Sequence, residues 1–397
     1  MTELLDRPLV SVVIPCLDEA RTIGSCIRSA REGLGELSGE VLVADNGSRD
    51  GSAQVARDLG ALVVDVAERG YGSALRGGIA AAQGEYIVIG DGDESYDFHD
   101  IGRFVAKLNE GYDLVLGNRF RGGIAKDAMP WLHKYVGNPV LSTLGRLLFN
   151  SNVGDFHCGL RAFRREKIRD LQLRSSGMEF ATEMVARAEL RGLRLTELPT
   201  TLQRDGRNRR PHLNTWRDGW RHLRLMLVLS PRWVFCFPGI VMVLCSLILT
   251  IRLLLGPVTV NGIVLDIHTL AYCLAGFTVG FHMLLFWVLA QVFVAATGVA
   301  QGTQRPTRLL HESYQNLVLA VGFLMCAAAL VITVIATSIW AQSGFGTLDP
   351  TAASRLVLPA VVMGTVGVEL VLATLFASLM AYSLGGKAVD TQGAGHA

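Results

Sequence analysis

The sequence predicts an α/β fold, a Rossmann-like domain with a mixed sheet, followed by an all-α membrane domain of four transmembrane helices. Two observations lead to this prediction. Short runs of β-branched residues alternate with helical stretches between residues 10 and 117, and long apolar blocks follow Trp233. The alternation favours a largely parallel sheet with helices on both faces. The apolar blocks instead suit the hydrocarbon core of a membrane.

Five strands are expected in the first part of the chain, separated by four helices. The expected strands are residues 10–14, 41–44, 62–66, 86–89 and 114–117, and the helices are residues 19–31, 52–59, 73–83 and 98–108. Ligands of such sheets bind beyond the carboxyl ends of the strands. The informative residues are therefore those that follow the first, second and fourth strands.

Carboxylates stand at all three of these strand ends: Glu19, Asp45, and Asp91 with Asp93. A dinucleotide-binding protein would carry a GxGxxG turn after its first strand, and the turn here reads Pro-Cys-Leu-Asp-Glu. Carboxylates repel phosphates, so we expect a divalent cation between them, Mg²⁺ or Mn²⁺, which favour oxygen ligands. An isolated Asp-Gly-Asp triplet is common in polar turns, and its position at a strand end is what makes it informative.

Four apolar stretches are each long enough to cross a hydrocarbon core, which needs about 20 helical residues. They cover residues 233–255, 269–296, 316–340 and 356–384. Arg232, Arg305, Arg308 and Lys387 fall on one side of the resulting topology, and Arg355 on the other. The positive-inside rule therefore predicts an integral, multi-pass membrane protein with its N-terminal domain in the cytoplasm.

Charge and amphipathicity suggest further contacts with the membrane. Residues 204–232 contain eight arginines and two aspartates, which suits anionic headgroups or phosphates; a solvated basic face or a topology signal is the alternative. Residues 127–149 have an amphipathic pattern typical of an interfacial helix, or of a buried packing helix. The seven cysteines show no paired spacing, so neither a zinc site nor a disulfide framework is indicated.

We therefore expect four parts in the chain. They are a cytoplasmic α/β domain at 1–210, a basic interfacial helix at 211–232, four transmembrane helices at 233–384 and a flexible tail at 385–397. Glu369 lies in the middle of the fourth span, where a carboxylate usually faces a partner or a cavity, and a structural pair is as consistent with the sequence as a functional one.

In their order along the chain, several motifs resemble the family 2 glycosyltransferases of the GT-A fold, specifically the polyprenyl-phosphate (dolichyl-phosphate) hexose synthases. The resemblance covers residues 8–232. It is carried by SVVIPCLDE at 11–19, VADNGSRDG at 43–51, GYGSALRGG at 70–78, IVIGDGD at 87–93, GNRF at 117–120, CGLRAF at 158–163 and ELP at 197–199.

The resemblance implies roles for individual residues. Those that would line the nucleoside pocket are Pro15, Leu17, Glu19 and Asp45. Asp91 would contact the ribose or the metal, and Asp93 would be the principal metal ligand on the donor pyrophosphate. Arg119 and Arg161 would face the phosphates.

Two positions depart from the family pattern. Ser95 stands where the family often has Gln or His, which leaves the third metal ligand open. Tyr71 stands where relatives often carry Lys or Asn, so the resemblance extends to this loop and not to that side chain.

The expected chemistry follows from the leaving group. A sugar nucleotide departs as a diphosphate, so positive charge must stabilise it while the acceptor attacks from the opposite face in an inverting single displacement. A lipid phosphate, with a second pKa near ~6, is already ionised and needs no strong base. Asp155 and Glu179 are the candidate bases, and Arg207 or Arg209 is expected to bind phosphate in the basic loop.

The sequence thus predicts a metal-dependent hexosyltransferase that uses UDP-hexose or GDP-mannose and a polyprenyl or dolichyl phosphate acceptor. A membrane polysaccharide synthase is one alternative, although the Gln of its Q-x-x-R-W motif is missing before Arg232. A non-catalytic nucleotide-sugar-sensing lipid carrier or scaffold is the other, and the intact Asp91 and Asp93 argue against it. No nucleic-acid partner is expected, and a homo-oligomer is left open.

Overall fold

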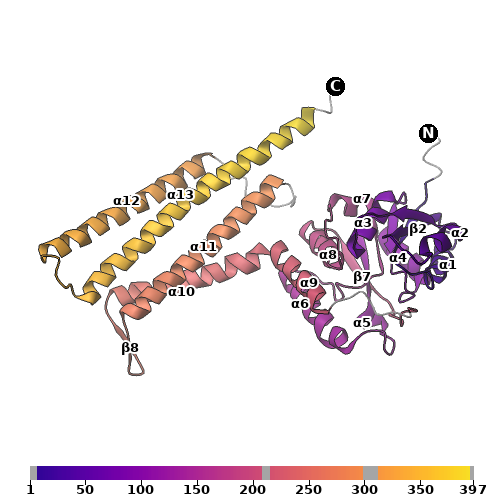
Figure 1. Cartoon of the computed structure of the whole chain (residues 1–397), viewed down its shortest axis with the longest axis horizontal. Helices are drawn as coiled ribbons and strands as arrows, with labels where there is room; N and C mark the ends of the chain where they lie inside the picture. The colour runs from indigo at the N-terminus through magenta and orange to yellow at the C-terminus, as the bar shows by residue number, and fades with distance from the viewer. Residues whose placement is uncertain (1–6, 208–214, 298–311, 394–397) are drawn as a thin grey trace. The chain divides into compact units, whose positions relative to one another are not determined.

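The computed structural model describes residues 7–207, 215–297 and 312–393 (Figure 1). The chain divides into two compact units, residues 1–230 and 231–397. The first unit contains the mixed sheet and its covering helices, and the second contains the long apolar helices.

A seven-stranded sheet with the order β3-β2-β1-β4-β6-β5-β7 forms the centre of the first unit. Its strands are β1 (Val10–Cys16), β2 (Gly39–Asp45), β3 (Leu62–Asp65), β4 (Tyr86–Ile89), β5 (Leu114–Asn118), β6 (Arg161–Arg164) and β7 (Leu195–Pro199). Strands β1 to β4 are parallel to one another, whereas β6 runs antiparallel to both β4 and β5. The predicted mixed sheet is confirmed.

Helices pack on both faces of this sheet because successive strand residues point to opposite sides. Val12 and Ile14 of β1 join the apolar cluster that contains Phe104, while Val13 joins the cluster that contains Leu75. The helices of these layers are α1 (Ile23–Leu34), α2 (Ser52–Asp58), α3 (Tyr71–Ala81), α4 (Ile101–Asn109), α7 (Arg165–Asp170) and α8 (Phe180–Leu190). The sheet is therefore buried on both sides, which fixes the positions of its strand ends.

Two further helical segments of the first unit carry exposed aromatic residues. A π-helical turn, η2 (His133–Gly137), leads into α6 (Asn138–Phe149), and α9 covers Thr215–Leu229. Trp131 is 67% exposed and Trp216 is 82% exposed, whereas Met226 on the inner side of α9 is fully buried. The sequence pattern placed these segments at the membrane interface; their amphipathic character is observed, and their position in a membrane stays a prediction.

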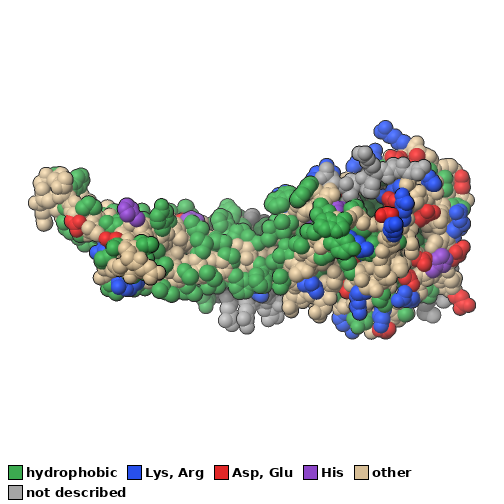
Figure 2. Space-filling model, turned by 90° about the horizontal axis from the view of Figure 1, so that it is seen from below, with side chains coloured by type: hydrophobic (Ala, Val, Ile, Leu, Met, Phe, Trp, Pro, Cys, Tyr) green, Lys and Arg blue, Asp and Glu red, His purple; other side chains and the backbone are tan. Residues whose placement is uncertain are grey.

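The second unit contains four helices that are long and apolar enough to cross a membrane. They are α10 (Phe237–Leu254) with the preceding turn η3 (Arg232–Cys236), α11 (Ile267–Thr297), α12 (Glu312–Gln342) and α13 (Pro350–Gly393). A short hairpin of β8 (Val258–Val260) and β9 (Ile263–Leu265) precedes α11. Apolar side chains dominate the surface of these helices in Figure 2, and the charged side chains gather on the first unit. The predicted four-helix membrane region is confirmed.

An ion pair joins two of these apolar helices. His282 Nε2 of α11 lies 2.7 Å from Glu369 Oε1 of α13. The carboxylate that the sequence placed in the middle of the fourth span therefore has a partner from another helix.

Candidate active site

The predicted carboxylates converge because β1, β2 and β4 are parallel neighbours whose carboxyl ends lie at one edge of the sheet. Hydrogen bonds link the segments that follow these strands. Thr22 Oγ1 donates to the carbonyl of Gly92 at 2.7 Å, and the amide of Asn46 donates to the carbonyl of Cys16 at 2.9 Å. Three separate strand ends thereby form one polar site.

Asp91 is held by a tyrosine on one oxygen and lies close to bare backbone on the other. The Tyr71 hydroxyl donates to Asp91 Oδ1 at 2.9 Å. A Cβ added at Gly159 would lie 2.6 Å from Asp91 Oδ2, so only glycine fits beside this carboxylate. Burial and the charge of Asp93 raise the pKa of Asp91 to about 6, and the hydrogen bond from Tyr71 opposes this shift. Burial also raises the pKa of the Tyr71 phenol well above its ordinary value, so the phenol stays a donor.

Asp93 has a different partner on each oxygen. Its Oδ1 accepts from the amide of Ser95 at 3.1 Å and from the Ser95 hydroxyl at 2.5 Å. Its Oδ2 lies 3.0 Å from Arg207 Nη2, and Arg207 Nε lies 2.8 Å from Glu19 Oε1. Backbone bonds anchor this contact, since the amide of Gly206 donates to the carbonyl of Asp93 at 2.9 Å. Arg207, which the sequence assigned to a phosphate, binds two carboxylates here.

The turns expected around the nucleoside are tied to each other. Asp45 Oδ2 accepts from the amides of Gly47 and Ser48, both at 3.1 Å, so this carboxylate closes its own turn. The amide of Asp18 donates to Ser48 Oγ at 2.9 Å. Asp18 has a φ of 56°, a left-handed conformation that Asn and Asp tolerate better than most residues.

The other predicted nucleoside residues lie in the same region. Pro15 is in β1, Leu17 is in the turn after it, and Glu19, 5% exposed, begins the segment before α1. Together with Asp45, the four residues predicted for the nucleoside pocket are thus brought to one end of the sheet.

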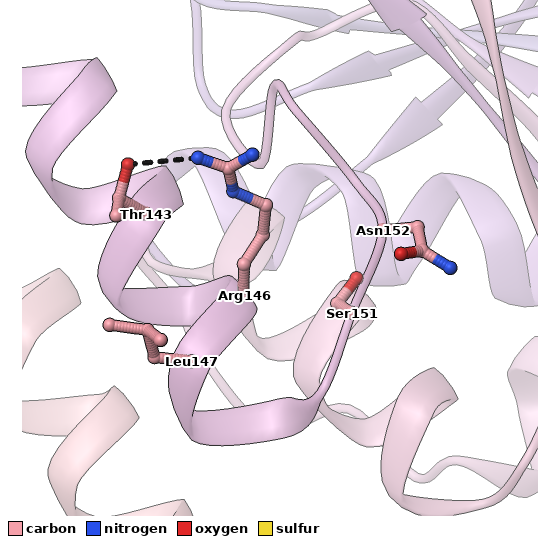
Figure 3. Close-up of a pocket in the computed structure, with 5 residues that line it drawn as sticks. All are labelled: Thr143, Arg146, Leu147, Ser151 and Asn152. Atoms are coloured by element: carbon pink, nitrogen blue, oxygen red, sulfur yellow. Dashed lines mark hydrogen bonds between the residues drawn. The ribbon is translucent and has the colours of Figure 1, made fainter.

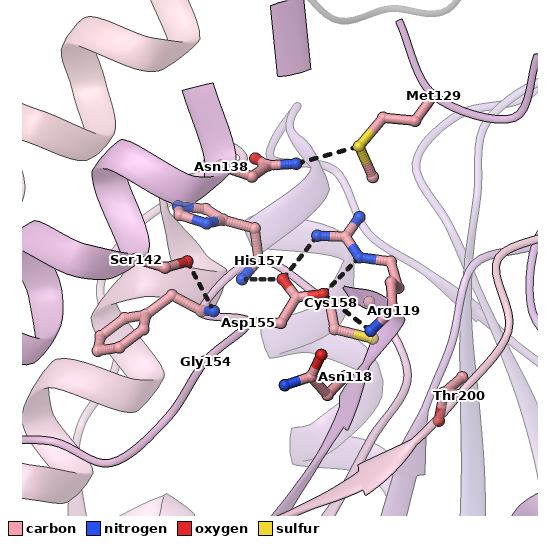
Figure 4. Close-up of polar contacts among 12 residues, drawn as sticks. Asn118, Arg119, Met129, Asn138, Ser142, Gly154, Asp155, His157, Cys158 and Thr200 are labelled. Carbon is pink, nitrogen blue, oxygen red and sulfur yellow. Dashed lines mark hydrogen bonds and ion pairs between the residues drawn. The ribbon is translucent and has the colours of Figure 1, made fainter. Parts of the chain in front are cut away.

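Asp155 and Arg119 form a buried ion pair with two parallel bonds (Figure 4). Arg119 Nε donates to Asp155 Oδ2 and Nη2 donates to Oδ1, both at 2.7 Å, and the Arg119 amide adds a third bond at 3.2 Å. Asp155 is fully buried, and its Oδ1 also accepts from the amide of His157 at 3.2 Å. Because its oxygens are occupied by these donors, Asp155 positions Arg119 and is not suited to remove a proton. The structure thus shows Asp155 as the partner of Arg119, and its role as a base stays a prediction.

Arg119 itself keeps donors for a ligand. An arginine side chain has five N–H groups, and two of those of Arg119 bond to Asp155. The ion pair thus orients the guanidinium without using all of its hydrogen-bonding capacity.

Arg161 lies inside the protein and does not face the site as expected. It is 1% exposed, and its guanidinium donates to three backbone carbonyls, each at 2.7 Å. These carbonyls belong to Phe156, Cys158 and Ala181. Arg161 therefore ties the segment before β6 to the start of α8, a positioning role that replaces the predicted phosphate contact.

One carboxylate oxygen of Glu179, Oε2, is buried without a hydrogen bond from the described residues. A Cβ added at Gly177 would meet Glu179 Oε2 at 2.5 Å and Arg221 Nη1 of α9 at 3.0 Å, which places both groups beside this glycine. The neighbouring Glu183 pairs with Arg187 at 2.8 Å on the same helix, as an i, i+4 pair.

Sequence reasoning missed a pair of buried histidines near the Arg119–Asp155 pair. The rings of His157 and His222 meet edge to face with centroids 4.7 Å apart, and Thr182 Oγ1 lies 2.7 Å from His222 Nδ1. Burial lowers the pKa of His222 to about 4 and that of His157 well below its ordinary value. No motif signals this pair, because its members lie far apart in the chain.

One surface hollow outside the carboxylate site contains none of the predicted residues. It is lined by Thr143, Arg146, Leu147, Ser151 and Asn152, at the end of α6 (Figure 3). Arg146 Nη2 donates to Thr143 Oγ1 at 3.1 Å, so its charged group is tied to its own helix. The polar chemistry is concentrated at the strand ends, and we therefore place the candidate active site there.

The residues present fit a divalent cation of the magnesium type. Asp91 and Asp93 bring two like charges together at a partly buried site, which a cation would relieve. In the described part of the chain, no group of three or more His, Cys, Asp and Glu side chains is arranged to hold a metal. Two carboxylates are nevertheless sufficient for Mg²⁺, which usually keeps several waters and shares substrate phosphates.

Comparisons with known proteins agree with this architecture. The family described as "Glycosyl transferase family 2" matches residues 11–172, and the "Glycosyltransferase family 2 C-terminal transmembrane region" matches residues 288–381. The low-salt glycan biosynthesis hexosyltransferase Agl6 of Haloferax volcanii is 32% identical over 384 residues, which cover 95% of this chain and 89% of the relative.

Two further similarities each cover about half of the chain. A dolichyl-phosphate hexose transferase of Haloferax volcanii is 30% identical over 190 residues, which cover 48% of this chain and 81% of the relative. Among solved structures, the glucosyl-3-phosphoglycerate synthase of Mycobacterium tuberculosis, in complex with Mn²⁺, UDP and glucosyl-3-phosphoglycerate, is 24% identical. That match has a TM-score of 0.45 and covers 56% of this chain and 80% of the other.

The fold, the carboxylate pair and the apolar helices define a membrane-embedded glycosyltransferase with a GT-A-like domain. More particularly, the chain belongs to glycosyltransferase family 2 and is an integral membrane protein.

Proposed function

We propose that this enzyme transfers a hexose from a nucleotide sugar to a polyprenyl phosphate at the cytoplasmic face of a membrane. The observation that carries the proposal is the pair Asp91 and Asp93 at the end of β4, beside Glu19 and the cationic Arg207. Relatives whose names give a hexosyltransferase and a dolichyl-phosphate hexose transferase support the substrate class.

Asp93 and Asp91 would hold Mg²⁺ or Mn²⁺ through their carboxylate oxygens. When bound, such an ion supplies positive charge to the departing nucleoside diphosphate. Pro15, Leu17 and Glu19 lie at the neighbouring strand end, where the nucleoside would sit.

Arg207 balances the negative charge of Glu19 and Asp93 in this structure. A divalent ion at Asp93 would take over that task, because two cations compete for the same carboxylate oxygen. The guanidinium would then be available for a phosphate, as the sequence predicted for this loop. Arg209, the second arginine of that prediction, lies outside the described residues.

The environment of Asp155 supports an acceptor that arrives already ionised. A hydroxyl acceptor needs a base to take its proton, whereas a lipid phosphate does not. Asp155 is committed to Arg119 by two bonds of 2.7 Å, which leaves Glu179 as the remaining carboxylate candidate. Arg119, oriented by that pair, would bind the acceptor or donor phosphate, and attack on the far side of the sugar would invert its configuration.

The exposed aromatic residues of the first unit support a position at the membrane surface. Trp131 lies just before η2 and Tyr135 lies within it, and Trp216 and Trp220 lie on α9; each of the four is at least 60% exposed. Tryptophan and tyrosine favour the headgroup region because they combine an apolar ring with a polar group. This arrangement would bring the lipid phosphate near the site, with the first unit on the cytoplasmic side.

The test is a transfer assay with the purified full-length protein. It is incubated with radiolabelled UDP-glucose, UDP-galactose or GDP-mannose, with Mg²⁺ or Mn²⁺, and with polyprenyl phosphate in detergent micelles. One labelled lipid species is the expected product. A labelled polymer would favour a polysaccharide synthase, and no product with any donor would favour a non-catalytic carrier.

A further inference from the structure

Each carboxylate of the Asp91–Asp93 pair has one oxygen engaged by a hydroxyl group of the protein. Tyr71 Oη donates to Asp91 Oδ1 at 2.9 Å, and Ser95 Oγ lies 2.5 Å from Asp93 Oδ1. The Ser95 amide adds a second bond to the same oxygen of Asp93 at 3.1 Å. The other oxygen of Asp91, Oδ2, is left for a ligand, whereas Asp93 Oδ2 contacts Arg207 Nη2 at 3.0 Å, a contact that a bound cation would replace.

The elements around these hydroxyls hold them in place. Tyr71 begins α3, where the amide of Ser73 donates to the carbonyl of Ser176 at 3.2 Å. Ser95 is 7% exposed, and its carbonyl accepts from the amide of Gln203 at 2.9 Å. Backbone hydrogen bonds therefore fix the segments that carry the two hydroxyl groups.

We propose that Tyr71 and Ser95 are specificity-determining residues that make Asp91 and Asp93 one-oxygen ligands and thereby select a small octahedral cation over Ca²⁺. The inference rests on the proposed function, since it concerns the same metal site. Ser95 stands where a third metal ligand was expected, and its hydroxyl is instead bonded to Asp93.

The selectivity follows from what the two kinds of cation require. Ca²⁺ takes six to eight oxygen ligands at flexible geometry and often binds both oxygens of a carboxylate. Mg²⁺ demands near-octahedral geometry and is commonly bound by one or two carboxylates together with waters and substrate phosphates. Two single oxygens thus suit Mg²⁺, and they deprive Ca²⁺ of the bidentate contacts that it needs to reach its higher coordination number.

The test compares two cations on the full-length protein in detergent micelles. The dissociation constants of UDP and of GDP are measured by titration calorimetry in the presence of Mg²⁺ and, separately, of Ca²⁺. The wild type is expected to bind the nucleotide more tightly with Mg²⁺. Tyr71→Phe releases Asp91 Oδ1 and should reduce the preference for Mg²⁺ over Ca²⁺ by about tenfold. Ser95→Ala removes the hydroxyl but keeps the amide bond to Asp93 Oδ1, so it should reduce the preference in the same direction and by less.

Tyr86→Phe is the matched control, because it removes a buried phenol hydroxyl that bonds to Asn109 at 2.8 Å and touches neither aspartate. Its Mg²⁺ to Ca²⁺ preference should equal that of the wild type. If Tyr71→Phe and Ser95→Ala weaken binding with both cations equally, the two hydroxyls serve only folding and the inference is overturned.

The proposed function can fail separately from this inference. A wild type that makes labelled lipid but shows no preference for Mg²⁺ over Ca²⁺ would overturn the selectivity while leaving the transfer reaction in place. A wild type that neither binds UDP or GDP nor makes labelled lipid would overturn the proposed function, and the inference with it.

Discussion

Arg207 joins two carboxylates of the site that come from different strand ends, with Nε 2.8 Å from Glu19 Oε1 and Nη2 3.0 Å from Asp93 Oδ2. The side chain of Arg207 is 18% exposed, and those of Glu19 and Asp93 are 5% and 11% exposed, so solvent screens these contacts only in part. The guanidinium occupies a position where the proposed reaction needs a metal ion. The guanidinium of Arg207 therefore competes with the metal ion for Asp93, and it can bind a phosphate of the substrate only after it has left that carboxylate.

Arg207→Ala should separate these two effects. Removing the competing cation should tighten binding of Mn²⁺ by about tenfold, the scale of one charge-assisted contact, while the rate of transfer falls. Electron paramagnetic resonance of free Mn²⁺ gives the first quantity, and steady-state transfer gives the second. Arg204→Ala, an exposed change in the same segment, is the control and should leave Mn²⁺ affinity unchanged. Weaker binding of Mn²⁺ by Arg207→Ala would contradict the competition.

Asp93→Ala should abolish transfer and leave the protein in the membrane. The proposed metal loses its main ligand, and a metal ion contributes several kcal/mol to stabilising the charge of the transition state. The membrane helices lie in the other compact unit, so insertion should not change. Transfer activity and extraction of the protein from membranes by detergent check the two halves of this prediction. Substantial turnover in the variant would remove the central role given to Asp93.

Asp155→Ala should fail mainly through stability and not through loss of a catalytic base. It leaves Arg119 as an unpaired buried charge, a change that typically costs about 3–5 kcal/mol. The double variant Asp155→Ala with Arg119→Ala should be less destabilised than the single variant, because both charges are gone. Thermal unfolding of the purified proteins measures both. A normally stable Asp155→Asn protein without activity would instead return Asp155 to the role of a base.

The buried histidines predict that stability depends on pH in the acidic range. His222 titrates at about 4 when folded and near 6.5 when unfolded, so the folded state takes up a proton later as the pH falls. Stability is therefore full above about pH 6.5 and declines between pH 6.5 and 4, by about 3 kcal/mol for this one group. His157, whose pKa is also lowered, should add to the decline. Thermal unfolding at a series of pH values tests this prediction. His222→Gln should weaken the dependence of stability on pH between pH 6.5 and 4. A variant with the same pH dependence as the wild type would contradict the role given to His222.

The sequence was most informative where the chain itself brings residues together. Asp91 and Asp93 follow a strand, and the rule that ligands bind beyond strand ends was enough to group them with Glu19. The apolar blocks likewise predicted the membrane helices without knowledge of their partners.

Roles that depend on contacts between distant residues could not be predicted. Arg161 was assigned to a phosphate, yet its partners are backbone carbonyls, which no side-chain motif reveals. Asp155 bonds to Arg119, which lies 36 positions away in the sequence, and Tyr71 bonds to Asp91, which lies 20 positions away. These pairings depend on the packing of the sheet and helices, so the same residue types in a sequence are compatible with either role.

The His282–Glu369 pair predicts a coupling between two membrane helices. His282 Nδ1 lies 2.7 Å from the carbonyl of Thr278 and must carry a proton there, since a carbonyl only accepts. The 2.7 Å contact between Nε2 and Glu369 Oε1 then needs one more proton, shared by the pair, so the two groups together are neutral. Either Glu369→Ala or His282→Ala leaves the other group without this partner on an apolar helix.

Each of these single variants should therefore destabilise the helix bundle, and the double variant should cost less than the sum of the two. Polar contacts between membrane helices contribute about 0.6–1.7 kcal/mol in such cycles. Unfolding of the full-length protein in mixed micelles measures the coupling energy. Transfer activity measured on the same samples shows whether loss of the pair changes the reaction at the candidate active site. A coupling energy of zero would mean that the contact does not tie α11 to α13, because an interhelical bond in the membrane has no water to replace it.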